Sequence, residues 1–109
     1  MSTSGWIGVD LDGTLAFYDG WKGPDEIGAP VPLMLSRVKA WVSEGVEVRI
    51  FTARASVPEQ VLPIQKWLEV HGIGGLKITN VKDFAMVELW DDRAIQILPN
   101  TGLRADGAK

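Results

Sequence analysis

Cysteine is absent from the chain, which excludes disulfides, thiolate metal sites and cysteine nucleophiles. A reducing compartment such as the cytoplasm suits such a chain, and we expect it there. No apolar run approaches the ~20 residues of a membrane span, and the first residues lack the basic and apolar regions of a signal peptide. We therefore expect neither a membrane segment nor secretion.

A basic excess is also missing, because 14 acidic residues outnumber 11 basic ones and the net charge is −3. This balance argues against a broad nucleic-acid interface, which needs many positive charges along the phosphate backbone, but it allows one small anionic ligand. With 109 residues, 46% of them hydrophobic, the chain suits one small domain over residues 1–109.

Short β-branched apolar runs alternate with longer helical stretches, which is typical of a parallel sheet built from βαβ units. We predict an α/β domain with a central parallel sheet of about five strands. The residue pattern places strands at 6–11, 46–52, 76–79, 86–90 and 94–98, helices at 30–44 and 56–70, an ordered loop or small hairpin at 15–29, and a frayed, flexible tail at 100–109. Ser56 has the spacing of a helix cap, and Pro63 should kink or split the second helix.

Polar residues gather where the predicted strands end, which is where open parallel sheets bind ligands. The residues at these exits are Asp10, Asp12 and Thr14, then Thr52 and Arg54, then Lys82, and finally Asp91 and Asp92. Carboxylates this close repel one another by several kcal/mol, about 4 kcal/mol per pair at ~4 Å and a dielectric of ~20. Hard oxygen ligands without His or Cys favour Mg²⁺, which commonly shares phosphate oxygens with a substrate.

These residues resemble the motifs of the haloacid dehalogenase superfamily of phosphohydrolases, over about residues 6 to 98. The sequence Asp10-Leu-Asp12-Gly-Thr14 after an apolar strand is similar to the first motif, and Thr52 at the end of Val-Arg-Ile-Phe-Thr to the second. Lys82 lies where the third is expected, and Asp91-Asp92 after Val-Glu-Leu-Trp resembles the fourth. No segment is long enough for a cap domain, so the resemblance is to the short, capless branch. It implies a three-layer, Rossmann-like α/β domain with the strand order 3-2-1-4-5.

The resemblance implies a Mg²⁺-dependent phosphatase in which Asp10 is the nucleophile and Asp12 the general acid and base. The metal ligands would be Asp10, the backbone carbonyl of Asp12, and Asp92, with Asp91 as its helper. The phosphate would be bound by Thr52 and Lys82, with Gly13 and Thr14 of the first turn beside them.

The sequence leaves several residue roles open. Lys77 competes with Lys82, but it begins its strand, whereas Lys82 follows the strand at the carboxyl edge. Arg54 either contacts the phosphate or leaving group or extends into solvent, and Tyr18 and Trp21 form either a flap or loop packing. A site without a cap domain is open to solvent, so either the substrate is large or a partner or second copy of the chain covers the site. We expect a small phosphorylated substrate, but the sequence does not identify it.

Other functions are compatible with parts of this pattern. A signalling receiver would hold a phosphoryl group without turnover, but its acceptor Asp should follow a later central strand, where this chain has Thr52. A true dehalogenase needs neither Asp12 as an acid nor a metal. The alternative function is a regulatory module that binds Mg²⁺ or accepts a phosphoryl group without efficient turnover.

Overall fold

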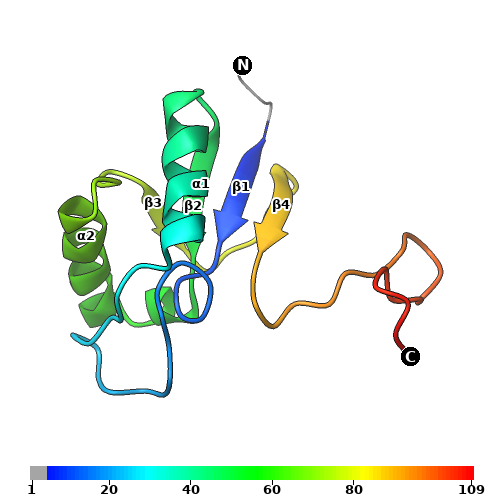
Figure 1. The fold of residues 1–109 in the computed structure, drawn as a ribbon, viewed down its shortest axis with the longest axis horizontal. Coiled ribbons are helices and arrows are strands. Elements are labelled where there is room, and N and C mark those ends of the chain that lie inside the picture. Colours follow the sequence, from blue (N-terminus) through cyan, green and yellow to red (C-terminus); the bar gives the residue numbers. More distant parts are fainter. Residues whose placement is uncertain (1–4) are drawn as a thin grey trace.

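Four strands form one parallel sheet in the computed structural model, which describes residues 5–109 (Figure 1). The order across the sheet is β3-β2-β1-β4, and all three strand pairs are parallel. The elements along the chain are β1 (Trp6–Val9), α1 (Pro32–Ser43), β2 (Glu47–Phe51), the short 3-10 helices η1 (Ala53–Ser56) and η2 (Pro58–Gln60), α2 (Val61–Val70), β3 (Lys77–Thr79) and β4 (Met86–Trp90). The mixed α/β architecture is compatible with the predicted Rossmann-like layout.

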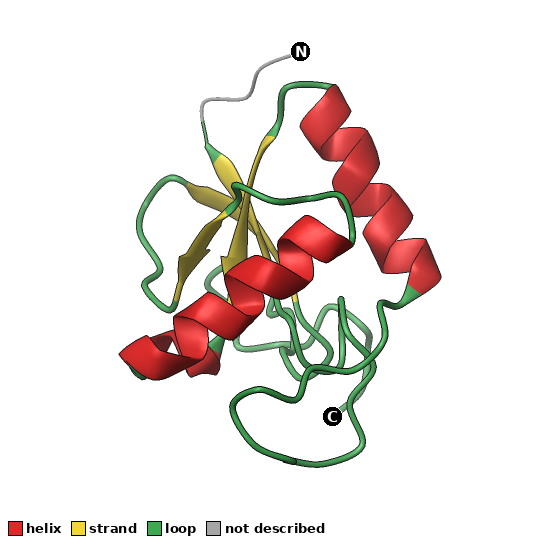
Figure 2. Cartoon of the chain, turned by 90° about the vertical axis from the view of Figure 1, so that its left-hand side faces the viewer, coloured by secondary structure: helices red, strands yellow, loops and turns green. Residues whose placement is uncertain are grey.

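One face of the sheet carries the hydrophobic core. Ile7 of β1 pairs with Val48 of β2, and Val9 pairs with Ile50, so these four side chains share a face. They form a single buried cluster with residues of both helices, namely Met34 and Val38 of α1 and Ile64 and Leu68 of α2. Both helices therefore cover the same face, giving two layers instead of the three predicted (Figure 2).

The missing third layer has a topological cause. The successive crossovers through α1 and α2 step in the same direction, from β1 to β2 to β3, and right-handed crossovers of that kind place both helices on one face. The chain then returns to β4, on the other side of β1, through residues 80–85 without a helix. The direction in which successive strands are added to the sheet thus reverses between β1 and β4. Open parallel sheets bind ligands in the crevice at such a reversal, which is flanked here by the carboxyl ends of β1 and β4.

The predicted fifth strand, residues 94–98, is wrong as part of this sheet. A parallel neighbour of β4 would have to start again at the amino edge, but residues 91–93 span roughly 10 Å when extended and β4 itself covers about 17 Å. Residues 96–98 pair instead with residues 103–105, where Leu98 N donates to Leu103 O at 2.8 Å and Ala105 N donates to Gln96 O at 2.9 Å. The predicted strand is thus one arm of a C-terminal hairpin.

The helices differ from the predictions in detail. Ser56 caps no helix, because its Oγ donates to Ala53 O at 2.8 Å within η1, and α2 begins only at Val61. Pro63 is therefore the third residue of α2, in the first turn, where a backbone N–H has no helical partner and its loss causes no kink. In α1, Met34 and Val38 are buried, whereas Leu33 is exposed.

Neither α-helix could cross a bilayer. α1 has 12 residues and α2 has 10, and no helix among residues 5–109 is both long and apolar enough to span a membrane.

Candidate metal and phosphate site

A tight turn fixes Asp10 and Asp12 at the carboxyl end of β1. The Asp10 N–H donates to Trp90 O at 2.9 Å, which ties the end of β1 to the end of β4. Leu11 and Leu15 are fully buried on either side of the turn and anchor it in the core. Residues 11–16 are held further by backbone bonds, including Ala16 N to Leu11 O at 2.8 Å. The two carboxylates are thus presented by backbone whose position the core determines.

Gly13 allows Asp92 to approach this turn. Its φ is +93°, a conformation that side chains disfavour, and a Cβ built there would lie 2.5 Å from Asp92 Oδ2. The N–H groups of Gly13 and Thr14 donate to the carbonyls of Ala16 and Leu11. Gly13 and Thr14 were predicted to bind phosphate, but their backbone N–H groups are already engaged in hydrogen bonds within the turn.

Three carboxylates converge at the crevice between β1 and β4. Asp10, Asp91 and Asp92 each offer an oxygen, and these oxygens lie within 4.8 Å of one another. The Thr14 hydroxyl lies between two of them, 3.3 Å from Asp10 Oδ2 and 3.3 Å from Asp92 Oδ1, and it accepts the Asp92 N–H at 3.0 Å. The arrangement brings together both aspartates of the predicted fourth motif with the first aspartate of the chain.

The electrostatics of this cluster are those of uncompensated negative charge. Burial, together with the nearby charges of Asp91 and Asp92 and a hydrogen bond shared with Asp92, raises the pKa of Asp10 to about 7, against the smaller opposing effect of Thr14. Among the residues that the structure describes, no lysine or arginine forms an ion pair with these three carboxylates. The donor set consists of hard carboxylate oxygens and fits Mg²⁺, whose charge would relieve the repulsion.

Asp12 is not a member of this cluster and is bound by Arg54. Arg54 Nε lies 2.7 Å from Asp12 Oδ2, and a second guanidinium nitrogen lies 2.9 Å from Asp12 Oδ1. The pair is largely removed from solvent, since the side chains are 5% and 20% exposed. Both oxygens of the predicted acid and base are therefore engaged, and Asp12 must release at least one bond before it can transfer a proton.

Arg54 also holds the loop at residues 17–29. It donates to Glu26 O at 2.9 Å and to Pro24 O at 3.3 Å, and its guanidinium lies 4.7 Å from the ring centre of Trp21. The base of the loop is closed by Phe17 N donating to Ala29 O at 2.8 Å. Residues 17–29 thus form a loop closed at its base, which is in line with the predicted ordered loop or small hairpin.

A cavity of about 1020 Å³ opens over these groups. Asp10, Asp12, Asp91 and Asp92 contribute to its wall, and Tyr18 and Trp21 of the loop line it as well. Thr52 also lines it, although the side chain is only 3% exposed. The Thr52 Oγ accepts the Arg54 N–H at 3.2 Å, which leaves the hydroxyl proton available for a ligand oxygen.

Lys82 does not line this cavity. It precedes Asp83, whose Oδ1 accepts from Trp6 Nε1 at 2.9 Å near the start of β1. The connection from β3 has by then returned toward the amino edge of the sheet, opposite the acidic cluster. Lys82 was predicted at the carboxyl edge, but a connection as short as residues 80–85 must turn back at once to reach the amino end of β4.

Arg54 forms the ion pair with Asp12 at the site, a role that was not predicted from the sequence. Arg54 follows β2, the strand beside β1, and it was already among the strand-exit residues. Four nearby carboxylates and a cation on the adjacent strand exit are a signal for such a pair.

No protein-family model, curated protein or solved structure gave a match to this chain.

Proposed function

We propose that the protein is a Mg²⁺-dependent phosphomonoester hydrolase that acts through Asp10. The observation that carries the proposal is the convergence of Asp10, Asp91 and Asp92 at the strand-order reversal, with Asp12 on the same turn. Asp10, Asp91 and Asp92 would hold the metal, which when bound would neutralise their negative charge and orient the phosphate. The resemblance of the first turn to the phosphohydrolase motif supports the same chemistry.

The reaction would proceed in two displacements. Asp10 attacks phosphorus, so a bond forms between its carboxylate oxygen and phosphorus while the bond to the leaving oxygen breaks, and Asp12 donates a proton to that oxygen. Water then attacks the phosphorus of the aspartyl-phosphate while Asp12 takes up a proton from the water, and the bond between phosphorus and the Asp10 oxygen breaks. This releases inorganic phosphate and restores the Asp10 carboxylate. Thr52 lines the cavity, and its hydroxyl would donate a hydrogen bond to an oxygen of the transferring group.

The experiment is a panel of phosphomonoesters assayed with and without Mg²⁺, using the wild type, Asp10→Asn and Asp25→Asn. Asp25 is an exposed carboxylate outside the acidic cluster, so its variant controls for the loss of one negative charge. We expect Mg²⁺-dependent release of phosphate from the wild type and Asp25→Asn, and none from Asp10→Asn. Hydrolysis by Asp10→Asn at the wild-type rate would refute the proposal.

One observation favours a second function, a Mg²⁺-binding or phosphoryl-accepting regulatory module without efficient turnover. Both oxygens of Asp12 are bound by Arg54, which withholds the group that would activate water. Acid-quenched mixtures with a small phosphodonor distinguish the two functions. A phosphorylated protein that persists for minutes, with no release of phosphate, would indicate the regulatory module.

A further inference from the structure

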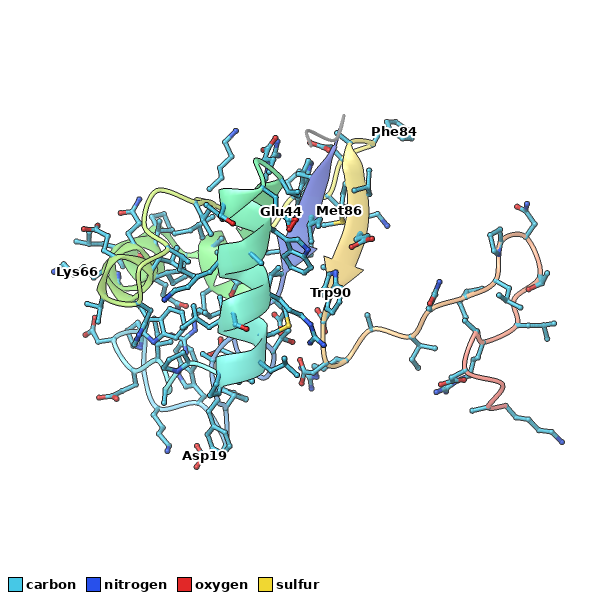
Figure 3. All side chains as sticks on the ribbon, turned by 45° about the horizontal axis from the view of Figure 1, so that its top comes forward. Asp19, Glu44, Lys66, Phe84, Met86 and Trp90 are labelled. Carbon is cyan, nitrogen blue, oxygen red and sulfur yellow. The ribbon has the colours of Figure 1, made fainter. Side chains whose placement is uncertain are left out.

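β4 presents an open strand edge. It is the last strand of the sheet and pairs only with β1 among the strands that the structure describes. Its apolar side chains are partly uncovered, since Val87 is 57% exposed and Leu89 is 38% exposed. Figure 3 shows Met86 and Trp90 along this strand and the C-terminal segment running away from it. An open edge with apolar side chains is a template for another strand.

The C-terminal hairpin, defined here as residues 94–105, has the complementary features. Its two arms pair through Leu98 N to Leu103 O and Ala105 N to Gln96 O. Ile97 lies opposite Arg104 as a bridge flanked by these bonds, so the Ile97 N–H and C=O point to the outer side of the hairpin. The hairpin exposes four large apolar side chains to solvent, those of Ile95, Ile97, Leu98 and Leu103.

An isolated two-stranded hairpin is at best marginally stable in water, and a third strand with an apolar face is what normally stabilises it. We infer that the C-terminal hairpin docks against the open edge of β4 in a second copy of the chain, with the outer edge of residues 94–98 as the added strand. The contact is reciprocal, so two copies exchange hairpins about a two-fold axis.

The hairpin cannot reach β4 of its own chain without dismantling the candidate site. Asp92 N donates to the Thr14 hydroxyl at 3.0 Å, and Arg93 N donates to Asp91 Oδ1 at 2.7 Å. These bonds direct the chain away from the sheet at residues 91–93. To pair with β4 in an antiparallel direction, the chain would have to turn at those same residues, which would pull Asp91 and Asp92 away from Asp10. A hairpin from a second copy can pair with the edge of β4 and leave these aspartates in place.

Docking would bear on the site, although the inference does not depend on the proposed function. Arg93 and Ala94, at the base of the hairpin, line the same cavity as Asp10 and Asp12. A hairpin anchored in a partner would fix this wall of the cavity. Dimerisation can be measured without any enzymatic activity, so failure of either proposal is distinguishable from failure of the other.

Sedimentation equilibrium over a wide concentration range tests the dimer. The variants are Ile95→Asp/Ile97→Asp in the hairpin and, as a matched control, Val70→Asp on α2, where the side chain is 78% exposed. We expect a concentration-dependent dimer for the wild type and Val70→Asp, and an association at least about tenfold weaker for the hairpin variant. Circular dichroism should show all three folded, because the substituted side chains lie outside the core cluster.

Cross-linking tests where the hairpin docks, because the chain has no cysteine of its own. Ile97→Cys is mixed with isotope-labelled Val87→Cys and treated with a short bismaleimide, and Val70→Cys replaces Val87→Cys as the control. We expect a mixed Ile97–Val87 product in excess over the Ile97–Val70 product. A wild type that stays monomeric at all concentrations, a dimer that the hairpin variant retains, or equal cross-linking to both sites would overturn the inference.

Discussion

The ion pair between Arg54 and Asp12 should be a principal stabilising contact of the site, and a double-mutant cycle measures it. The guanidinium of Arg54 donates four hydrogen bonds, two to Asp12 and one each to the carbonyls of Pro24 and Glu26. Hydrogen bonds to charged groups contribute about 1.5–3 kcal/mol each, and breaking a buried pair costs about 3–5 kcal/mol. Because the Asp12 side chain is 20% exposed, solvent reduces these values.

We therefore expect Arg54→Met to lower the free energy of unfolding by about 2–4 kcal/mol, out of the about 5–15 kcal/mol of an ordinary domain. The coupling energy between Arg54→Met and Asp12→Asn, measured by urea denaturation at pH 7, should be about 2 kcal/mol. Arg54→Lys should recover little of the loss, since an ammonium cannot form the two parallel bonds and also reach the loop. A coupling energy near zero would refute this account of the site.

Three further predictions concern the cluster and its surroundings. The pKa of Asp10 is raised from 3.8 to about 7, so the folded state binds the Asp10 proton more tightly than the unfolded state does. Without metal, the free energy of unfolding should therefore fall as the pH rises from about 4 to 7, and adding Mg²⁺ should restore it. Thermal melts that do not change across this pH range would contradict the prediction. Gly13→Ala should destabilise the chain by about 1–3 kcal/mol more than Gly45→Ala. Both glycines have a positive φ, but only at Gly13 would a Cβ meet a carboxylate, that of Asp92. Equal losses of unfolding free energy in urea titrations would show that the close approach is unimportant. Lys82→Ala should change the rate of phosphate release by less than about threefold, since Lys82 does not line the cavity, and a loss of about 100-fold would return it to the phosphate site.

The part of the site that the sequence could predict is the part fixed by strand ends. Asp10 and the Asp91-Asp92 pair directly follow β1 and β4, and parallel strands deliver their carboxyl ends to one edge, so alternation of apolar runs sufficed to bring them together. The four strands of the sheet and both helices were predicted for the same reason. Their exact ends differed by a few residues because capping depends on local hydrogen bonds.

What the sequence could not predict depended on where connections run. The position of Lys82 and the loss of the third layer both follow from the short return between β3 and β4, which apolar periodicity does not report. The binding of Asp12 by Arg54 joins residues 42 positions apart, and only the neighbouring placement of β1 and β2 brings them together. The residue pattern of 94–98 predicted a strand, but not which edge the strand would join.

The most direct test of the central claim is calorimetric titration of the metal-free protein with Mg²⁺ at pH 8. The account predicts one saturable site in the wild type, affinity at least about tenfold weaker in Asp10→Asn and in Asp92→Asn, and unchanged affinity in the control Asp25→Asn. A wild type that binds no Mg²⁺, or an Asp92→Asn variant that binds it as tightly as the wild type, would contradict the claim that these carboxylates form a metal site.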